Sequence, residues 1–395
     1  MKQIGPGLVW KLSELEVNVV LLGVISDVHL DRFFPRYVWQ ALVRRLQLFE
    51  TSVKELGAYG VGVLVILGDF IDFLTLNGTF PAEVPVIQEV MRLIRRLQAS
   101  GVVVILLKGN HDRLLFDNDG LKGWWPTVLA ENHWRADWLF LEDDWLRVLF
   151  DHGHRWDITN REIFDQHGRC IKSLGDLVVE RLIVPLQSEC PELNRVEPLY
   201  HIPLYLQQRD PGGQLLQRWL AEFERLMKSP DFKRWRRHVL PFAKRVLASM
   251  LPLFYDIYST ATNGSPASLM SAMERISEFD RKSGDYLQKR QKELLAGKID
   301  PDDYPHEWQS FVEDVRYIVS GHTHRKSQQV DLDPDGHWRG KISTGAWVKR
   351  LQLFPESRQP RSLTHFELTW TEFLISLTER RLMEIKQESP ASIIF

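Results

Sequence analysis

The chain has 395 residues, enough for two or three ordinary domains or one large domain with an insertion. Hydrophobic residues make up 44% and charged residues 26%, which excludes a disordered or fibrous chain. The 50 basic and 52 acidic residues give a net charge of −2, which argues against a globally basic nucleic-acid binder. The two cysteines, Cys170 and Cys190, are too few for a disulfide framework or a thiolate zinc site and suit a reducing compartment.

The sequence predicts neither a signal peptide nor a membrane-spanning segment. Gly5, Pro6 and Gly7 interrupt the region where a signal peptide has an unbroken apolar run. Apolar stretches such as Val17–Ile25 are far shorter than the roughly 20 residues that a helix needs to cross a bilayer. We therefore expect a cytoplasmic protein.

Predicted strands and helices alternate in the first third of the chain. Val19–Ile25, Val61–Leu67 and Val102–Leu107 are apolar, β-branched runs, typical of strands buried on both faces. Tyr37–Leu56 and Val86–Gln98 place apolar residues at helical spacing, with basic residues on the opposite face. The pattern is that of strand–helix–strand units.

Beyond these units the pattern changes twice. Trp138–Leu141 and Trp145–Phe150 predict a hairpin, and amphipathic helical patterns broken by proline and glycine then run from about 155 to 312. Strands return at Val315–Val319, Gly340–Thr344, Ser362–Glu367 and Thr371–Ser376. The predicted organisation is a β-rich core, formed by residues 1–154 and 313–395, with a helical insertion over 155–312.

Polar clusters follow directly after five predicted strands. The carboxyl ends of strands in open α/β sheets converge on one crevice, so we expect these side chains to lie together. They are Asp27, His29, Asp69, Asn110, His111, His152, His154, His322 and His324. Each alone has a simpler interpretation, because aspartate often caps a turn or helix and paired histidines also occur on solvent-facing edge strands.

Together, these clusters predict a binuclear metal site. Mixed imidazole and carboxylate ligands favour borderline divalent metals, whereas an all-oxygen set favours Mg²⁺ or Ca²⁺. Seven ligands drawn from these nine residues are too many for one tetrahedral zinc. They suit two metals about 3.5 to 4 Å apart that share a carboxylate. Mn is our first expectation, while the same ligands accept Fe, Zn, Co and Ni.

The motifs resemble those of the calcineurin-like metallophosphoesterases, in that family's order. They are Asp27-x-His29, Gly68-Asp69-x-x-Asp72, Gly109-Asn110-His111-Asp112, His152-Gly153-His154 and Gly321-His322-Thr323-His324. The resemblance covers residues 1–154 and 313–395. It implies an α/β fold of two packed mixed β-sheets flanked by helices, to which this chain adds the large helical insertion.

The resemblance also implies a role for each matched residue. It assigns Asp27, His29 and His324 to the first metal, Asn110, His152 and His322 to the second, and Asp69 to both. A hydroxide held between the ions then attacks phosphorus in line and cleaves a phosphoester or pyrophosphate bond. His111 is then the candidate to assist the leaving group, and Asp112 is the candidate to orient the His111 ring. Asp72 would support the loop or a metal ligand. His154 and Arg155 are candidate contacts to the substrate phosphate.

The branches of the family differ at two of these positions. Protein Ser/Thr phosphatases have Arg where this chain has Phe73 and Glu where it has Asp112. The UDP-2,3-diacylglucosamine pyrophosphatases look most similar, through residues 152–157 and 343–347, but carry Arg in place of His111. Two alternatives stay open: an Mre11-like nuclease or nucleic-acid phosphodiesterase, and a non-catalytic scaffold, which the intact ligand set disfavours.

A basic stretch lies inside the predicted insertion. Between Gln214 and Met250, nine Lys or Arg accompany three acids, together with several aromatic residues. One interpretation is a helical bundle with its own aromatic core and solvated basic residues. The other is a lid that offers a basic, apolar surface to an anionic substrate and makes peripheral membrane contact. We expect a phosphorylated small-molecule or lipid-linked substrate, no protein partner and no nucleic acid.

Overall fold

The computed structural model contains two compact units. The first comprises residues 1–153, 291–348 and 367–395, and the second 154–290 and 349–366. The residues that the structure describes are 1–14, 19–117, 133–142, 147–196, 202–239, 259, 287–298, 304–313, 315–324, 326–332, 338–344 and 371–376.

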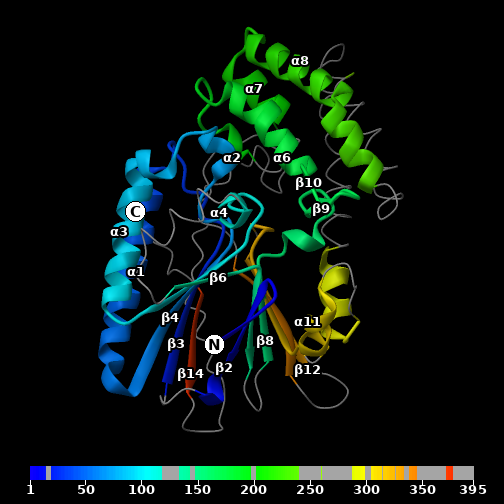
Figure 1. The fold of residues 1–395 in the computed structure, drawn as a ribbon. Coiled ribbons are helices and arrows are strands. Elements are labelled where there is room, and N and C mark those ends of the chain that lie inside the picture. The colour runs from blue at the N-terminus through cyan, green and yellow to red at the C-terminus, as the bar shows by residue number, and fades with distance from the viewer. Residues whose placement is uncertain are drawn as a thin grey trace. The chain divides into compact units, whose positions relative to one another are not determined.

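A five-stranded sheet in the order β14-β3-β4-β5-β6 forms one layer of the first unit (Figure 1). Its strands are β3 (Val19–Ile25), β4 (Gly60–Leu67), β5 (Val103–Leu107), β6 (His133–Ala136) and β14 (Thr371–Ser376). β3 to β6 are parallel, and β14 joins β3 antiparallel. Parallel neighbours need crossover connections, which α1 (Arg36–Leu56) and α3 (Pro85–Ala99) supply.

A seven-stranded sheet in the order β1-β2-β7-β8-β11-β13-β12 forms the second layer. Its strands are β1 (Lys2–Ile4), β2 (Gly7–Lys11), β7 (Trp138–Glu142), β8 (Arg147–Asp151), β11 (Tyr317–Ser320), β13 (Trp338–Thr344) and β12 (Lys326–Leu332). β7 and β8 pair antiparallel as a hairpin, whereas β8 and β11 are parallel neighbours. The loops that follow β8 and β11 therefore leave the sheet at the same edge.

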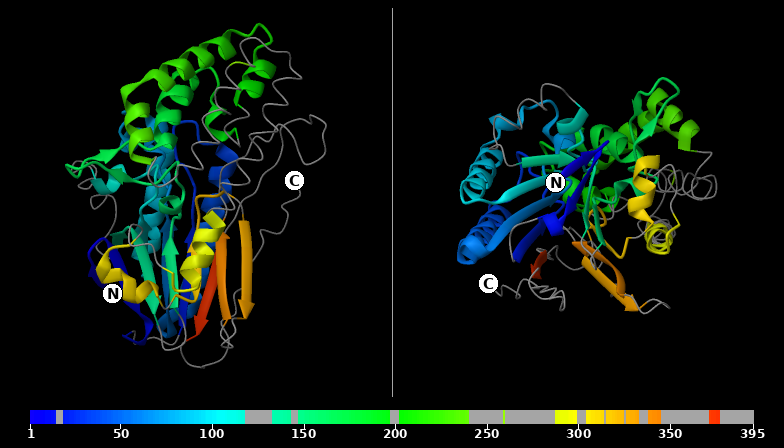
Figure 2. Two further views of the ribbon diagram at one scale, coloured as in Figure 1. Left: turned by 90° about the vertical axis from the view of Figure 1, so that its right-hand side faces the viewer. Right: turned by 60° about the horizontal axis from the view of Figure 1, so that its bottom comes forward.

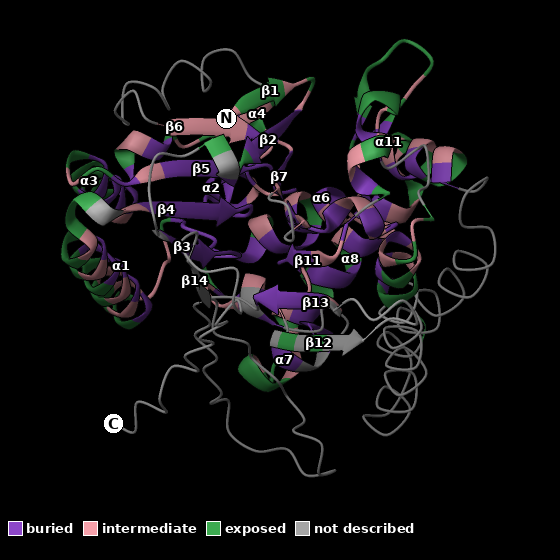
Figure 3. Cartoon of the chain, turned by 90° about the horizontal axis from the view of Figure 1, so that it is seen from below, coloured by how far each residue is buried: buried purple, intermediate pink, exposed green. Residues whose placement is uncertain are grey.

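The two sheets pack against each other through one apolar core. Val20, Val65 and Ile105 of the five-stranded sheet share this core with Leu139 and Phe150 of the seven-stranded sheet, and each is at most 1% exposed. The opposite face of the five-stranded sheet lies under α1 and α3, whose apolar stripes form a second core. Because both faces are covered, β4 and β5 are buried along nearly their whole length (Figure 3).

Among its described residues, the second unit contains helices and one short strand pair. Its elements are β9 (Ile163–Phe164), β10 (Cys170–Ile171), α6 (Leu174–Val178), α7 (Ile202–Arg209), α8 (Gln214–Lys228) and a helix over 230–239. Ser173 and Asp176 form a capping box that starts α6. α7 and α8, green in Figure 2, pack on each other, and α8 buries Trp219 and Phe223.

The observed architecture confirms the predicted fold class, two packed mixed sheets flanked by helices. The sequence pattern did not predict β1, β2, β6, β9, β10 or β12, because short edge or near-edge strands such as β6 carry no apolar alternation. The strand predicted at Ser362–Glu367 lies outside the described residues. Within the described part of the chain, no helix combines the length and apolar character that a membrane span requires.

Candidate metal centre

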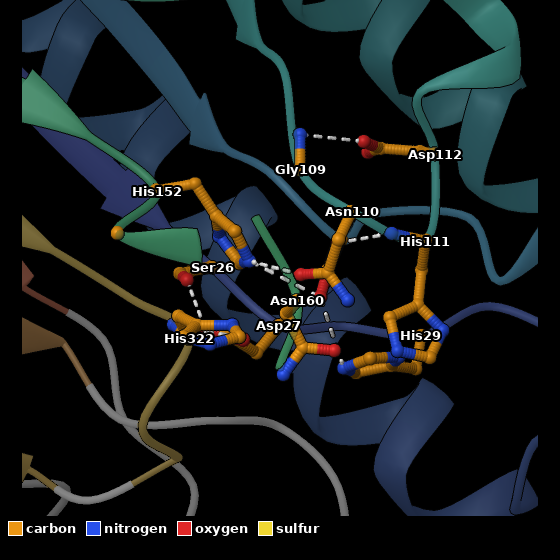
Figure 4. Close-up of polar contacts among 12 residues, drawn as sticks. Ser26, Asp27, His29, Gly109, Asn110, His111, Asp112, His152, Asn160 and His322 are labelled. Carbon is orange, nitrogen blue, oxygen red and sulfur yellow. Dashed lines mark hydrogen bonds and ion pairs between the residues drawn. The ribbon is translucent and has the colours of Figure 1, made fainter. Parts of the chain in front are cut away.

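The predicted ligands follow the carboxyl ends of five strands in the first unit. β3, β4 and β5 are consecutive in one sheet, and β8 and β11 are adjacent in the other. The polar residues are Asp27 and His29 after β3, Asp69 and Asp72 after β4, Asn110, His111 and Asp112 after β5, His152 after β8, and His322 and His324 after β11. Figure 4 shows labelled side chains from the loops after β3, β5, β8 and β11 gathered in one place.

Five of the seven predicted ligands adopt a left-handed backbone conformation. The φ angle is 53° at Asp27, 51° at His29, 51° at Asp69, 65° at His322 and 53° at His324. A non-glycine residue in this region costs about 1 kcal/mol or more, and such strain concentrates at functional sites. The loops after β3 and β4 stabilise each other, since the His29 N–H donates to the Asp69 carbonyl at 2.9 Å.

Glycines permit the close approach of these loops. Gly68 has a φ of 81°, and a Cβ there would lie 2.7 Å from the ring of His152. A Cβ at Gly109 would overlap the carboxylate of Asp69. Both glycines therefore leave space for a side chain of the site, which explains why they precede its aspartate and asparagine.

One cluster of potential ligands consists of Asp27, His29 and His324. The Nε2 atoms of the two histidines are 3.2 Å apart, and His324 Nε2 lies 3.2 Å from Asp27 Oδ1. Metal–ligand distances of about 2.1 Å place neighbouring ligand atoms about 3.0 to 3.4 Å apart. The spacing of these atoms therefore fits a cation among them. The backbone N–H of His322 donates to the buried Asp27 carboxylate at 3.0 Å and holds it in place.

A second cluster contains Asp69, His152 and His322, with Asn110 beside it. His152 Nε2 lies 3.1 Å from Asp69 Oδ2 and 3.3 Å from Asn110 Oδ1. His152 Nδ1 is 2.8 Å from the carbonyl of Leu67 and can only donate to it, which leaves Nε2 as the ligand atom. Asp69 Oδ2 also lies 3.8 Å from His29 Nε2 of the first cluster, so one oxygen faces both clusters.

Asp72 connects His111 with His29. Its Oδ1 atom lies 2.9 Å from His111 Nδ1, and its Oδ2 atom 3.6 Å from His29 Nδ1. Asp72 is also the N-cap of α2 (Phe73–Leu76), where its side chain accepts from the Thr75 N–H. The buried carboxylate therefore orients both rings through the nitrogens that face away from the predicted ligand positions.

The structure places the Asp112 carboxylate, which we expected to orient His111, on two backbone N–H groups. The Asp112 carboxylate is fully buried and accepts from the backbone N–H groups of Phe70 and Gly109, at 2.9 and 2.8 Å. Asp112 therefore fastens the loop after β5 to the loop after β4. Sequence adjacency suggested Asp112 as the partner of His111, but the turn between them points the two side chains apart, and the ring meets Asp72.

The electrostatics of the site favour cations. Burial opposes charging of Asp27, but His152 and His324 outweigh it and lower its pKa to about 2. Burial likewise opposes a charge on His152, but Asp69 and Asp27 raise its pKa to about 10. Burial and the Asp69 charge raise the pKa of Asp112 to about 7. The buried carboxylates thus hold protons on their neighbours, at positions where bound metal ions would replace them.

His154 and Arg155 belong to the second unit, where they begin a 3₁₀ turn, His154–Trp156. His154 is buried and Arg155 half-buried. Their predicted contact with substrate stays a prediction.

Four of the nine basic residues of the basic stretch form ion pairs within the second unit. The pairs are Arg218 with Glu189, Arg225 with Glu222, Lys228 with Glu224, and Arg234 with Asp165. Two of these acids, Glu189 and Asp165, lie outside the stretch and offset part of its positive charge. Trp219, Phe223 and Trp235 are at most 5% exposed. This is the arrangement described by the bundle interpretation, in which the aromatic residues form a core.

The chain is similar to known proteins in two comparisons. A family model described as calcineurin-like phosphoesterase matches residues 21–235, more than half of the sequence. A crystal structure of a dimetal phosphatase from Danio rerio is 14% identical, covers 91% of this chain and 93% of its own, and has a TM-score of 0.31. No curated protein matches the sequence. The chain belongs to the calcineurin-like phosphoesterase family and is a hydrolase of phosphoester bonds.

Proposed function

We propose that the protein is a phosphohydrolase that uses two divalent metal ions. Asp27, His29 and His324 would hold one ion, Asn110, His152 and His322 would hold the other, and Asp69 would be shared by both. The observation that carries the proposal is the position of Asp69 Oδ2, which lies 3.8 Å from His29 Nε2 and 3.1 Å from His152 Nε2. The mixed nitrogen and oxygen donors suit Mn²⁺, which we propose as the working metal.

The chain's own residues prepare the site in two ways. The metal ions, when bound, supply an acidified water and neutralise the phosphoryl oxygens. The protein contributes rigidity, because a hydrogen bond to the Leu67 carbonyl fixes the ring of His152 through its second nitrogen. The carboxylate of Asp72 faces the second nitrogen of His29 at 3.6 Å. The ligand atoms are therefore already oriented, and little reorganisation accompanies the reaction.

His111 is the residue proposed to act on the leaving group. Its side chain is 18% exposed, whereas those of Asp69 and Asp72 are at most 3% exposed, so the ring is open to a bound substrate. The carboxylate of Asp72 on Nδ1 stabilises the protonated ring and leaves Nε2 to donate a proton to the departing oxygen.

For the substrate we propose a phosphorylated small molecule or a lipid-linked phosphate. We also propose that the protein works in the cytoplasm without a protein partner. A screen of nucleotides, nucleotide sugars, phospholipid head groups and single- and double-stranded DNA with Mn²⁺ separates these substrate classes. Turnover of DNA alone would favour the nuclease alternative.

The direct test is hydrolysis of p-nitrophenyl phosphate and its bis ester. We expect Mn²⁺-dependent turnover that a chelator abolishes and added metal restores. Asp69→Asn should lose activity and most bound metal. Glu50→Gln is the matched control, because it also converts a buried carboxylate to an amide, but on α1, where Arg96 pairs with it. Chelator-resistant turnover, or full activity of Asp69→Asn, would contradict the proposal.

A further inference from the structure

A cavity lies in the first unit, beside the edge strand β6. It has a volume of about 430 Å³, within the range of small-molecule sites. Its lining comes from the turn between β1 and β2, from α4 (Leu114–Asp117), from the end of β5 and from β6. Figure 3 shows α4, β1 and β6 near one another. No residue proposed as a metal ligand lines this cavity.

Hydrogen bonds hold the walls of the cavity together. The Asp137 N–H donates to the Pro6 carbonyl at 2.8 Å, which fastens the β1–β2 turn to the end of β6. Lys108 N donates to the Ala136 carbonyl at 3.0 Å, and the Lys108 ammonium pairs with Asp117 at 3.2 Å. Hydrogen bonds therefore link the segments that line the cavity, and Asp117 compensates the positive charge of Lys108.

Arg135 differs from the other charged groups of this wall. Its guanidinium is half-buried and donates from Nη1 to the Leu115 carbonyl at 2.8 Å. Among the residues that the structure describes, no carboxylate forms an ion pair with it, although Asp117 and Asp137 line the same cavity. Burial alone lowers its pKa. Of the hydration that this half-buried cation has lost, the Leu115 carbonyl replaces one hydrogen bond, and no carboxylate of the described residues compensates its charge.

We propose that this cavity binds a small organic anion, with a carboxylate or phosphate group on Arg135 and a flat apolar part against Trp134 and Phe116. A guanidinium presents five N–H donors in a planar fork, and the bond to Leu115 uses one of them. The remaining donors suit two oxygens of one anionic group. Trp134 and Phe116 line the same cavity and supply its aromatic surface.

The cavity also touches the loop of the proposed active site. Lys108 directly precedes Gly109 and Asn110, and α4 begins on the Asp112 carbonyl, to which Leu115 N donates at 2.9 Å. A ligand that moves the Arg135 side chain therefore affects α4 through the hydrogen bond to Leu115. Through α4 it also affects the segment that carries His111. The anion site is separate from the metal centre but mechanically connected to it.

The test measures binding of benzoate, phenylphosphonate and neutral benzamide to the full-length protein by calorimetry. Wild type should bind one or both anions more tightly than benzamide. Arg135→Gln should weaken anion binding by about tenfold or more, the value of a charged hydrogen bond, and leave benzamide unchanged. The affinity of Arg135→Lys for the anions should lie between those of wild type and Arg135→Gln, because lysine keeps the positive charge but lacks the planar fork of donors. Arg92→Gln, at an exposed position of α3, is the matched control.

Measurements in the Asp69→Asn background separate this site from the metal centre. Anion binding that survives Asp69→Asn but falls with Arg135→Gln supports the proposal. Anion binding that survives Arg135→Gln and Arg135→Lys, or disappears only with Asp69→Asn, overturns it. So does wild-type binding of both anions that is no tighter than that of benzamide. Melting temperatures of all variants show that each is folded.

Discussion

The pairing of Asp72 with His111 predicts how the variant Asp72→Asn behaves. Asparagine keeps the shape of the side chain and its cap on α2, but removes the negative charge 2.9 Å from His111 Nδ1. A hydrogen bond to a charged partner contributes about 1.5 to 3 kcal/mol. If that energy stabilises the protonated ring in the transition state, its loss lowers kcat by about 10- to 150-fold.

Comparing substrates with different leaving groups tests the proton transfer more specifically than kcat for one substrate does. p-Nitrophenol departs readily without a proton, whereas phenol and alcohols require one. Asp72→Asn should therefore reduce kcat more for phenyl phosphate than for p-nitrophenyl phosphate, at saturating Mn²⁺. His111→Ala should show the same selectivity with a larger loss, about 10² to 10⁴.

The double variant and the metal content complete this test. Because both residues serve one proton transfer, Asp72→Asn combined with His111→Ala should be little slower than His111→Ala alone. Asp72 also faces His29 at 3.6 Å, so bound metal is measured in parallel. Equal losses for both substrates, or fully additive losses in the double variant, would refute the proposed role of Asp72.

Three further predictions concern stability and metal binding. Gly68→Ala should destabilise the protein by about 2 kcal/mol or more in denaturant unfolding and lower metal occupancy; Gly78→Ala, with a similar φ of 82° but open space around its Cβ, should cost less. Although burial opposes its charge, Lys54 and Arg96 hold the pKa of Glu50 below its ordinary value. Glu50→Gln should therefore cost about 1 kcal/mol of unfolding free energy near neutral pH, and this difference should disappear as the pH falls through the lowered pKa; a constant difference down to acid pH would contradict this. Because its neighbours raise the pKa of His152 to about 10, this residue is protonated at pH 7 in the ion-free protein. Metal binding should then release about one proton, visible as buffer-dependent calorimetric heats, and buffer-independent heats would count against His152 as a ligand.

Much of the fold and of the proposed site follows from local patterns. The buried parallel strands β3, β4 and β5 show as apolar runs because both faces of the sheet are covered, so no alternation interrupts them. The same runs end in polar residues, which places the candidate ligands at one edge of the sheets. Short strands such as β6 were not predicted, because their sequences lack the alternation of apolar and polar residues that marks a half-buried strand. They are strands only because they pair with a neighbouring strand in the folded protein.

The contacts between loops required the tertiary structure. His322 lies 295 positions after Asp27, yet its N–H donates to that carboxylate, and no periodicity encodes such a pairing. Similarly, the choice of Asp72 over Asp112 as the partner of His111 depends on how two loops from different strands face each other. A sequence pattern reports which face of an element is buried. Which residue a side chain meets across a loop or a cavity, as Arg135 meets Leu115, is decided only when separate elements pack together.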